Sequence, residues 1–242
     1  MHQSLHRNQI AAYLFNKLAT LAPWPAELLP VPTLVDGTAF FPGGAGLWQE
    51  SSATTSPDIM VIGQDFSTFA EHADMLAGQS RDIDSKTWVN FRALASTTGL
   101  DLCRCFFTNA VMGLRAYGSS EGPNPGYHRG NLEFMQRSQE FLSLQISVLR
   151  PKLILVLGLR AAVVLSACTP ELKEWSLGKH KPIDDSGRAF FAKVRISDVE
   201  VPIALLTHPS RWYRNVQLRR YGGMTGREAE YALLQDAIAA VG

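Results

Sequence analysis

IMVIGQDFS, residues 59–67, begins with four apolar residues and continues into a segment that contains Gly63 and Asp65. A short run of consecutive apolar residues is typical of a strand that is buried on both faces, as in a parallel sheet. Glycine at position 63 allows the backbone to turn sharply and to approach a ligand closely. This stretch therefore predicts a central strand that delivers Gln64 and Asp65 to the edge of a sheet.

Other apolar stretches of strand length follow at residues 105–108, 153–157 and 203–207. Helical patterns lie at residues 88–98, 132–149, 160–167 and about 227–241. Because strands and helices alternate, we predict an α/β fold with three layers, α/β/α, around a central, mainly parallel sheet of four strands. Residues 189–196 alternate less cleanly and are expected to add a strand beside residues 203–207.

The 242 residues, 46% of them hydrophobic, are enough to bury the core of one domain. Residues 1–56 are predicted to form an N-terminal helix and an irregular extension rich in Pro, Gly, Ser and Thr, and residues 57–242 the main domain. The apolar stretches are much shorter than the roughly 20 residues of a membrane span. We therefore expect a cytoplasmic monomer that does not enter a membrane.

The charge of the chain is balanced, with a formal net charge of +1, so attraction to nucleic acid must come from a local group of cations. Such a group lies near the C-terminus and consists of Arg211, Arg214, Arg219 and Arg220. The three cysteines contain no Cys-x-x-Cys pair that would indicate a zinc or redox site. We therefore expect reduced thiols and no metal.

Polar residues from several strands are expected at one edge of the sheet, because the carboxyl ends of parallel strands meet there. Asn109, Gly158 and His208 follow the second, third and fourth strands. An aspartate can activate water, an asparagine can read the edge of a pyrimidine, and a neutral histidine can donate to an oxygen that gains negative charge. Structural roles are open too, with Asp65 as a helix N-cap, Asn109 as a loop cap and His208 as a packed side chain.

The order and spacing of these residues resemble the uracil-DNA glycosylase superfamily. Gly63-Gln64-Asp65 resembles the start of that family's water-activating motif Gly-Gln-Asp-Pro-Tyr, and His208-Pro209-Ser210 resembles the start of its second motif. Between them, Thr108-Asn109-Ala110-Val111 and residues 140–158 are similar to the branch that includes the thermostable bacterial enzymes. The likeness covers roughly residues 57–240, which would be the catalytic domain, whereas residues 1–56 match nothing in the family.

The resemblance implies a DNA glycosylase that flips a pyrimidine, uracil or a related deaminated base, out of DNA and hydrolyses its N-glycosidic bond to leave an abasic site. Asp65 would position the attacking water, and His208 would stabilise the departing base. Asn109 would read the base, Trp88 would stack on it, and the backbone N–H of Gln64 would contact one of its oxygens. The reaction requires no metal or other cofactor.

The resemblance also implies a DNA-binding surface directly after His208. Ser210 would contact a phosphate, and Trp212 would be the wedge that fills the gap left by the flipped base. Arg211 and Arg214 flank this wedge in the sequence and would contact further phosphates. DNA is therefore the expected partner.

Two departures from the family pattern bear on specificity and cofactors. The prototypical motif has a tyrosine two residues after its aspartate, where the ring blocks the 5-methyl group of thymine. This chain has Ser67 there, after Phe66, so both residues are expected to border the base and to leave room for a 5-substituent. Gly113 stands where the close branch has an iron–sulfur cysteine, and Cys103 and Cys105 lie one strand earlier, so no cluster is expected.

Three functions remain open on the sequence. The first is excision of uracil or a related deaminated base. The second is excision of a hypermodified 5-substituted cytosine from phage DNA, which would make the chain an antiviral defence enzyme, and the third is a catalytically silent DNA-binding module. The loop at residues 116–129, with His128 and Arg129, is long for a connection and would form part of the recognition surface. A nucleotide-binding Rossmann protein is disfavoured because residues 158–162 lack spaced glycines.

Overall fold

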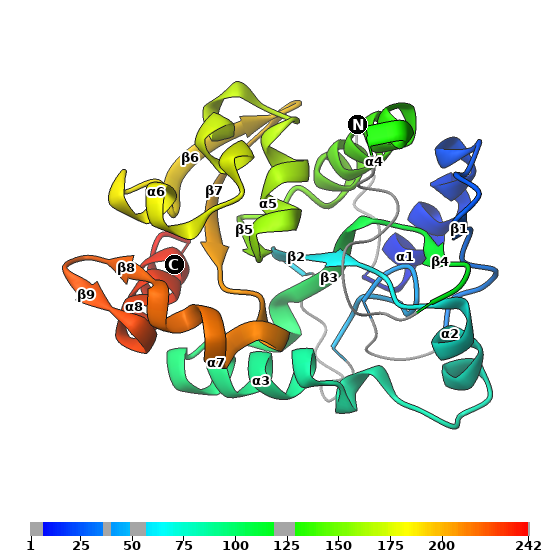
Figure 1. Cartoon of the computed structure of the whole chain (residues 1–242), viewed down its shortest axis with the longest axis horizontal. Coiled ribbons are helices and arrows are strands. Elements are labelled where there is room, and N and C mark those ends of the chain that lie inside the picture. The colour runs from blue at the N-terminus through cyan, green and yellow to red at the C-terminus, as the bar shows by residue number, and fades with distance from the viewer. Residues whose placement is uncertain (1–6, 36–39, 49–56, 119–128, 242) are drawn as a thin grey trace.

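A five-stranded, mainly parallel sheet lies at the centre of the structure, a computed structural model that describes residues 7–35, 40–48, 57–118 and 129–241 (Figure 1). The strand order is β3-β2-β5-β7-β6. The strands are β2 (Ile59–Asp65), β3 (Cys105–Val111), β5 (Leu153–Leu157), β6 (Phe190–Ile196) and β7 (Val199–Leu206). The predicted α/β class and parallel sheet are confirmed. The sheet has five strands rather than four, because β6 pairs antiparallel with β7 at the edge, which confirms the strand expected at residues 189–196.

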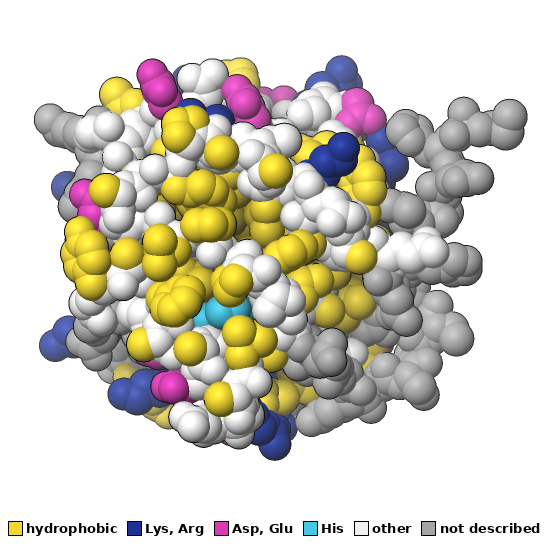
Figure 2. Space-filling view, turned by 90° about the vertical axis from the view of Figure 1, so that its right-hand side faces the viewer, with side chains coloured by type: hydrophobic (Ala, Val, Ile, Leu, Met, Phe, Trp, Pro, Cys, Tyr) yellow, Lys and Arg dark blue, Asp and Glu magenta, His cyan; other side chains and the backbone are white. Residues whose placement is uncertain are grey.

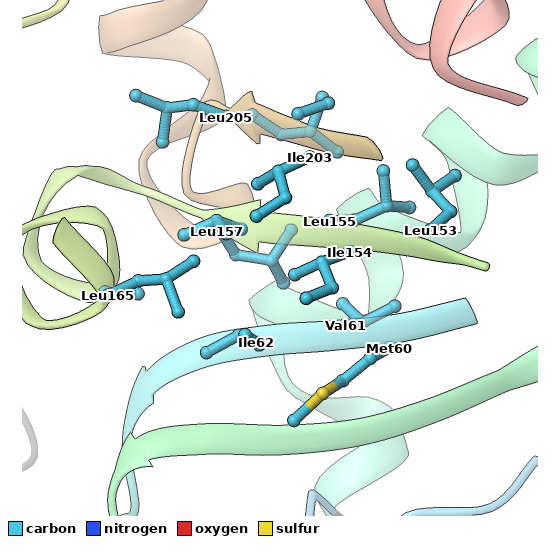
Figure 3. Packing of buried hydrophobic residues seen from close by; sticks show 14 of the residues in the cluster. Met60, Val61, Ile62, Leu153, Ile154, Leu155, Leu157, Leu165, Ile203 and Leu205 are labelled. Atoms are coloured by element: carbon cyan, nitrogen blue, oxygen red, sulfur yellow. The ribbon is translucent and has the colours of Figure 1, made fainter. Parts of the chain in front are cut away.

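The parallel strands are buried because their side chains are apolar on both faces. Every residue of β5 is buried, and the first five residues of β2 are buried too. Val61, Leu155 and Ile203 come from three adjacent strands and belong to one core cluster (Figure 3). Full burial of such a side chain contributes about 1.5–3 kcal/mol. The apolar stretches that predict strands are therefore also the main source of stability.

The helices surround the sheet. They are α1 (Arg7–Lys17), α2 (Phe69–Leu76), α3 (Lys86–Thr98), α4 (Leu132–Leu149), α5 (Leu159–Ser166), α6 (His180–Asp185), α7 (Trp212–Asn215) and α8 (Gly226–Ala239). Short 3₁₀ helices lie at Leu18–Leu21, Asp82–Asp84, Leu102–Arg104, Arg129–Asn131, Pro170–Leu177, Pro209–Arg211 and Val216–Leu218. Helices α4 and α5 contact each other and β3, whereas α8 contacts β6, β7 and α3. No helix in the described part of the chain is long and apolar enough to cross a membrane.

Local sequence explains where the helices next to the strand ends begin. Thr68 caps α2 in a capping box, in which its hydroxyl accepts from the Glu71 N–H at 3.2 Å and the Glu71 carboxylate accepts from the Thr68 N–H at 3.0 Å. Ser85 caps α3 by accepting from the Trp88 N–H. Side chains that satisfy the first N–H groups of a helix fix its start. These caps hold α2 and α3 beside the carboxyl end of β2.

The N-terminal segment packs against the outer side of β3. Leu14 and Leu21 lie in a buried cluster with Phe41 and Phe106. Strand β1 (Leu28–Leu29) pairs antiparallel with β4 (Leu114–Arg115), and Phe41 forms an isolated bridge to Thr108 in β3. The remaining two strands, β8 (Arg220–Tyr221) and β9 (Met224–Thr225), form a hairpin. The packing of the segment brings Phe40 close to the end of β2.

One side of the molecule exposes apolar side chains. Hydrophobic groups gather on the side that carries β1, β4 and α2, and charged groups lie mainly toward the edges of this view (Figure 2). Exposed apolar residues of these elements include Leu29, Phe69 and Leu76. The described part of this face therefore lacks the clustered lysines and arginines of a nucleic-acid-binding surface.

An ion triad joins three strands at the opposite end of the sheet from their carboxyl termini. Asp58 accepts two hydrogen bonds from Arg104, at 3.0 and 2.9 Å, and lies 3.4 Å from the Lys152 ammonium. Burial alone would raise the pKa of Asp58, but Arg104 and Lys152 hold it below the usual value of 3.8. The ionised form of Asp58 therefore stabilises the folded state.

We expect the Asp58→Asn variant to lower the free energy of unfolding by about 1–2 kcal/mol at pH 7, since the carboxylate is only partly exposed. The folded-state pKa lies below the unfolded value, so the contribution is fully present above pH 3.8 and is lost as the pH falls further. Urea titrations of wild type and variant at several pH values measure the difference. Asp198→Asn, at an exposed pair with Arg150, is the matched control and should change stability much less. An equal effect of the two variants at pH 7 would contradict the prediction.

Candidate functional site

A pocket of about 690 Å³ opens at the carboxyl ends of the parallel strands. Its walls include Gly63, Gln64 and Asp65 from β2, Asn109 from β3, and His208 after β7. Ligands of open α/β sheets bind at this edge, where the loops after the strands converge. The structure therefore brings together the strand-end residues that the sequence singled out.

Asn109 is packed directly against Gly63. The two residues are paired in the register of β2 and β3. A Cβ atom on residue 63 would lie 2.4 Å from the Asn109 Oδ1 and 3.1 Å from the Phe40 ring, so only glycine leaves room for this amide. Asn109 lies within β3, which continues to Val111, and not in the loop after the strand as predicted. The amide is therefore held by the sheet, which favours fixed recognition of one ligand edge.

Asp65 forms a buried ion pair that the sequence did not reveal. The Arg115 guanidinium donates to the Asp65 carboxylate at 2.6 Å, and the two side chains are only 4% and 10% exposed. The Arg115 N–H also donates to the Ser67 carbonyl at 3.1 Å. Arg115 lies in the short strand β4, and its position after an apolar segment was the only sequence signal. The guanidinium thus fixes the Asp65 carboxylate at the pocket wall.

His208 is held in one orientation. Its Nδ1 accepts from the Ser210 N–H at 3.3 Å and lies 2.9 Å from the Ser210 hydroxyl oxygen. Burial, and then the nearby Arg211, lowers the pKa of His208 to about 4, so the ring is neutral at pH 7. Because Nδ1 accepts a hydrogen bond, the proton of the neutral ring resides on Nε2. His208 therefore presents a neutral N–H donor.

Gly158 makes the position of His208 possible. Its φ is positive, at 85°, and it directly follows β5. A Cβ atom on this residue would lie 2.7 Å from the His208 Cβ, closer than side chains tolerate. The absence of a side chain at position 158 thus lets His208 pack against the end of the neighbouring strand.

The aromatic residue predicted to stack on a base is part of the core. Trp88 is fully buried and packs edge-on against Phe107, with ring centroids 4.5 Å apart, and against Phe40 and Trp48. It borders the pocket but is 0% exposed, so its ring offers no open face for stacking in this structure. Phe40, which the sequence analysis missed, lines the pocket beside Gly63.

The residues after Asp65 differ in their surroundings. Phe66 is buried in a small cluster with Val31 and Leu114, and its ring lies against Gly43. Its ring is therefore mainly structural, although Phe66 also borders the pocket. Ser67 lines the pocket, and its hydroxyl is buried without a hydrogen-bond partner among the described residues. Ser67 is the residue of this pair that a ligand could satisfy.

The predicted wedge, Trp212, is not exposed. It is 8% exposed and stacks on Tyr231 of α8, with centroids 6.2 Å apart. The next residue, Tyr213, is 68% exposed, and Arg227 lies over its ring at 5.7 Å. Ser210 is exposed but is bonded to His208, as described above. The projecting aromatic group of this loop is therefore Tyr213.

Three of the four arginines in the basic cluster are exposed, and one is buried. Arg211 and Arg214 are exposed and form no ion pair within the described ranges. Arg219 is 1% exposed and contacts Asp184 at 3.1 Å and Glu230 at 3.4 Å, and Arg220 lies 3.8 Å from Asp185. Of this cluster, Arg211 and Arg214 are therefore the exposed arginines without an acidic partner in the described part of the chain, and Arg211 lines the pocket.

The site offers no preformed metal centre in the described part of the chain, where no group of three or more His, Cys, Asp or Glu side chains could hold a metal ion. Burial raises the pKa of the Cys105 thiol well above its usual value of 9.0, so that thiol is inert. Most of the predicted recognition loop, residues 119–128 with His128, lies outside the described residues, as does the side chain of Arg129.

Comparison of the sequence with models of known protein families finds no match, and comparison with curated proteins finds none either.

Proposed function

We propose that this chain is a DNA glycosylase of the uracil-DNA glycosylase type, which hydrolyses the N-glycosidic bond of a flipped pyrimidine and leaves an abasic site. The observation that carries the proposal is the meeting of Asp65, Asn109 and His208, from β2, β3 and the end of β7, at one pocket. These side chains supply a carboxylate, an amide and a neutral donor. The combination matches what base recognition and bond cleavage require.

The chemistry follows from the roles of three side chains. Asn109 binds the edge of the flipped base, since its amide offers both a donor and an acceptor. As the bond between C1′ and the base nitrogen breaks, the electron pair moves to the base, and the His208 Nε2–H donates to the oxygen that becomes negative. Water then bonds to C1′ and loses a proton, which the anionic base takes up, so the products are a sugar hydroxyl at C1′ and a neutral free base. Asp65 positions this water and stabilises the positive charge on the sugar.

Arg115 is a positioning residue in this proposal. It contacts the Asp65 carboxylate from within the protein, and both side chains are buried, so the pair is rigid. A fixed carboxylate costs no reorganisation when charge develops on the sugar. The arrangement suits a role for Asp65 in electrostatic stabilisation and water positioning, because the guanidinium holds the carboxylate in one place.

The DNA surface in this proposal lies around the segment that follows His208. Arg211 and Arg214 supply phosphate contacts, and Tyr213 replaces Trp212 as the group that fills the gap left by the flipped base.

Contacts of α4 and α5 with β3, and of α8 with β6 and β7, support the finer inference of a three-layer α/β/α fold. In Figure 1, α5 and α3 are drawn on different sides of the sheet, in keeping with this inference.

A second candidate substrate is a pyrimidine with a large polar 5-substituent, such as a hypermodified cytosine of phage DNA. The observation in its favour is the Ser67 hydroxyl, which is buried at the pocket and lacks a partner among the described residues. A buried hydroxyl without a partner costs about 1–3 kcal/mol, and a polar substituent would remove this cost. The pocket volume of about 690 Å³ is also ample for a substituted base.

The experiment that tests both candidates measures base release directly. The protein is incubated with duplexes that contain uracil, a thymine mismatch, 5-hydroxymethylcytosine or its glucosylated form, and alkali then cuts any abasic site. The same preparation of an Asp65→Asn variant controls for a contaminating glycosylase. Cleavage of only the uracil duplex would reject the second candidate. No scission of any duplex would reject both and leave the silent DNA-binding module.

A further inference from the structure

A second histidine lines the same pocket and is held in place by a buried network. His180 lies at the start of α6 and is only 8% exposed, yet it contributes to the pocket wall. Its Nδ1 is 3.2 Å from an Arg219 nitrogen. No described residue forms a hydrogen bond with its Nε2, which leaves that nitrogen to the pocket.

The contact with Arg219 determines the protonation of His180. A guanidinium has only donors and stays charged, so the Nδ1 of His180 must accept. Burial, and then the charge of Arg219, lowers the pKa of His180 to about 3, so the ring is neutral at pH 7. Its proton is therefore on Nε2. His180 and His208 thus both present a neutral Nε2–H to one pocket.

The network behind His180 leads to the segment that carries His208. Arg219 contacts Glu230 at 3.4 Å, and Glu230 accepts from the Thr207 N–H at 2.5 Å and from the Thr207 hydroxyl at 3.2 Å. Thr207 directly precedes His208 in the sequence. The two imidazoles are therefore fixed relative to each other through buried contacts, and the His180 ring cannot rotate without breaking its bond to Arg219.

The surroundings of His180 indicate what it binds. Asp65 and Glu71, the carboxylates on the pocket wall, belong to the β2 and α2 side, whereas α6 lies beside β7 and β8 (Figure 1). Arg160, at the start of α5, and Arg211 also line the pocket. A neutral N–H donor and two guanidinium groups in one pocket favour an anionic oxygen as ligand.

We propose that His180, Arg160 and Arg211 form a subsite for one phosphodiester group of the bound DNA strand, next to the flipped nucleotide. The inference rests on the proposed function and extends it, because it assigns His180 a direct contact with the substrate. His208 lies at the end of β7, between the base-binding residues of β2 and β3 and the α6 side of the pocket. This order suits a base on one side of His208 and a backbone phosphate on the other.

Imidazole ¹⁵N NMR tests the subsite without any substitution. In the free protein at pH 7, His180 and His208 should both give the neutral Nε2–H pattern. A duplex that contains the uncleavable abasic analogue tetrahydrofuran should shift the Nε2 signals of both residues. A shift of His208 alone would overturn the subsite but leave the proposed function intact, whereas no shift of either residue would count against both.

A coupling experiment identifies the phosphate. His180→Asn keeps an oxygen that accepts from Arg219 but cannot reach into the pocket, and its melting temperature reports whether the fold is kept. We expect this variant to bind the tetrahydrofuran duplex about tenfold more weakly, the loss of one charge-assisted hydrogen bond. A methylphosphonate at one position beside the analogue should weaken wild type similarly and cause no further loss in the variant.

Two outcomes would overturn the subsite while base release persists. One is unchanged affinity of His180→Asn for the duplex. The other is that, at every position tested, a methylphosphonate weakens duplex binding by the same factor in wild type and in His180→Asn. Inorganic phosphate is the control that distinguishes a free phosphate ligand from a phosphate of DNA. If it shifts the His180 Nε2 signal while no methylphosphonate position is coupled to His180, the ligand is free phosphate and the assignment to DNA is overturned.

Discussion

Replacement of Asp65 by asparagine is expected to slow base release by about 100-fold to 10,000-fold, with DNA affinity changed by less than about threefold. The amide keeps the shape of the side chain but removes the charge that positions water and stabilises the sugar cation. Single-turnover rates with alkali treatment measure base release on whichever duplex the wild type cleaves. Fluorescence anisotropy with the uncleavable abasic analogue measures affinity.

Glu71→Gln is the matched control for this prediction. Glu71 is the other carboxylate on the same pocket wall, but it serves the cap of α2, and glutamine can still accept from the Thr68 N–H. The control should therefore keep a rate within a few-fold of wild type. Loss of the Asp65 charge also leaves Arg115 without its carboxylate, so melting temperatures are compared for both variants. An Asp65→Asn variant that is folded and as fast as wild type would remove the role assigned to this residue.

The sheet and the strand-end residues could be predicted because their signals are local. The apolar run before Gly63 predicts a buried strand by itself, and the parallel arrangement brings Asp65, Asn109 and His208 to one edge whatever the loops do. The reason for glycine at position 63 could not be predicted, because the residue lies inside β2 opposite Asn109 and not at a turn. The short apolar runs and the order of the parallel strands thus predict where most residues of the candidate site lie.

The rest depends on partners that are distant in the sequence. Trp212 and Tyr213 are equally aromatic neighbours, and only the position of Tyr231 on α8 decides that Trp212 is covered and Tyr213 exposed. Arg115 reaches Asp65 only because β4 folds back along the loop after β2. Phe40 likewise reaches the pocket through contacts of the N-terminal segment with β3. These contacts cannot be predicted from the spacing of apolar and polar residues along the sequence.

His180 and Arg219 show the same limit for charged residues. Arg219 stands in a run of arginines that looks like one basic surface, but Asp184 and Glu230 approach it from two other elements and enclose it. Burial then turns a DNA-binding candidate into a structural residue. The same enclosure fixes His180, which the sequence shows only as a lone histidine.

Replacement of Arg219 by methionine is expected to lower the free energy of unfolding by about 3–5 kcal/mol at pH 7, because it leaves two buried carboxylates without their cation. Methionine roughly fills the volume of the side-chain stem. Arg219 is 1% exposed and also donates to the Leu205 carbonyl at 3.0 Å, so the loss falls on the end of β7. Urea unfolding followed by tryptophan fluorescence measures the change.

The pH dependence of this loss identifies its cause. Burial raises the pKa of both Asp184 and Glu230 even though Arg219 opposes the shift, so each holds a proton more tightly in the folded state than in the unfolded one. A carboxyl group with a raised folded-state pKa lowers the free energy of unfolding as the pH rises through that pKa. Without the Arg219 charge, the pKa of both groups rises further, so more stability is lost at high pH. The destabilisation should therefore be larger at pH 8 than at pH 5. Arg220→Met, at an exposed neighbour 3.8 Å from Asp185, should change stability little at either pH. If Arg219→Met is as stable as wild type but binds DNA weakly, the prediction is wrong, and Arg219 belongs to the DNA-binding surface that the run of arginines in the sequence suggests.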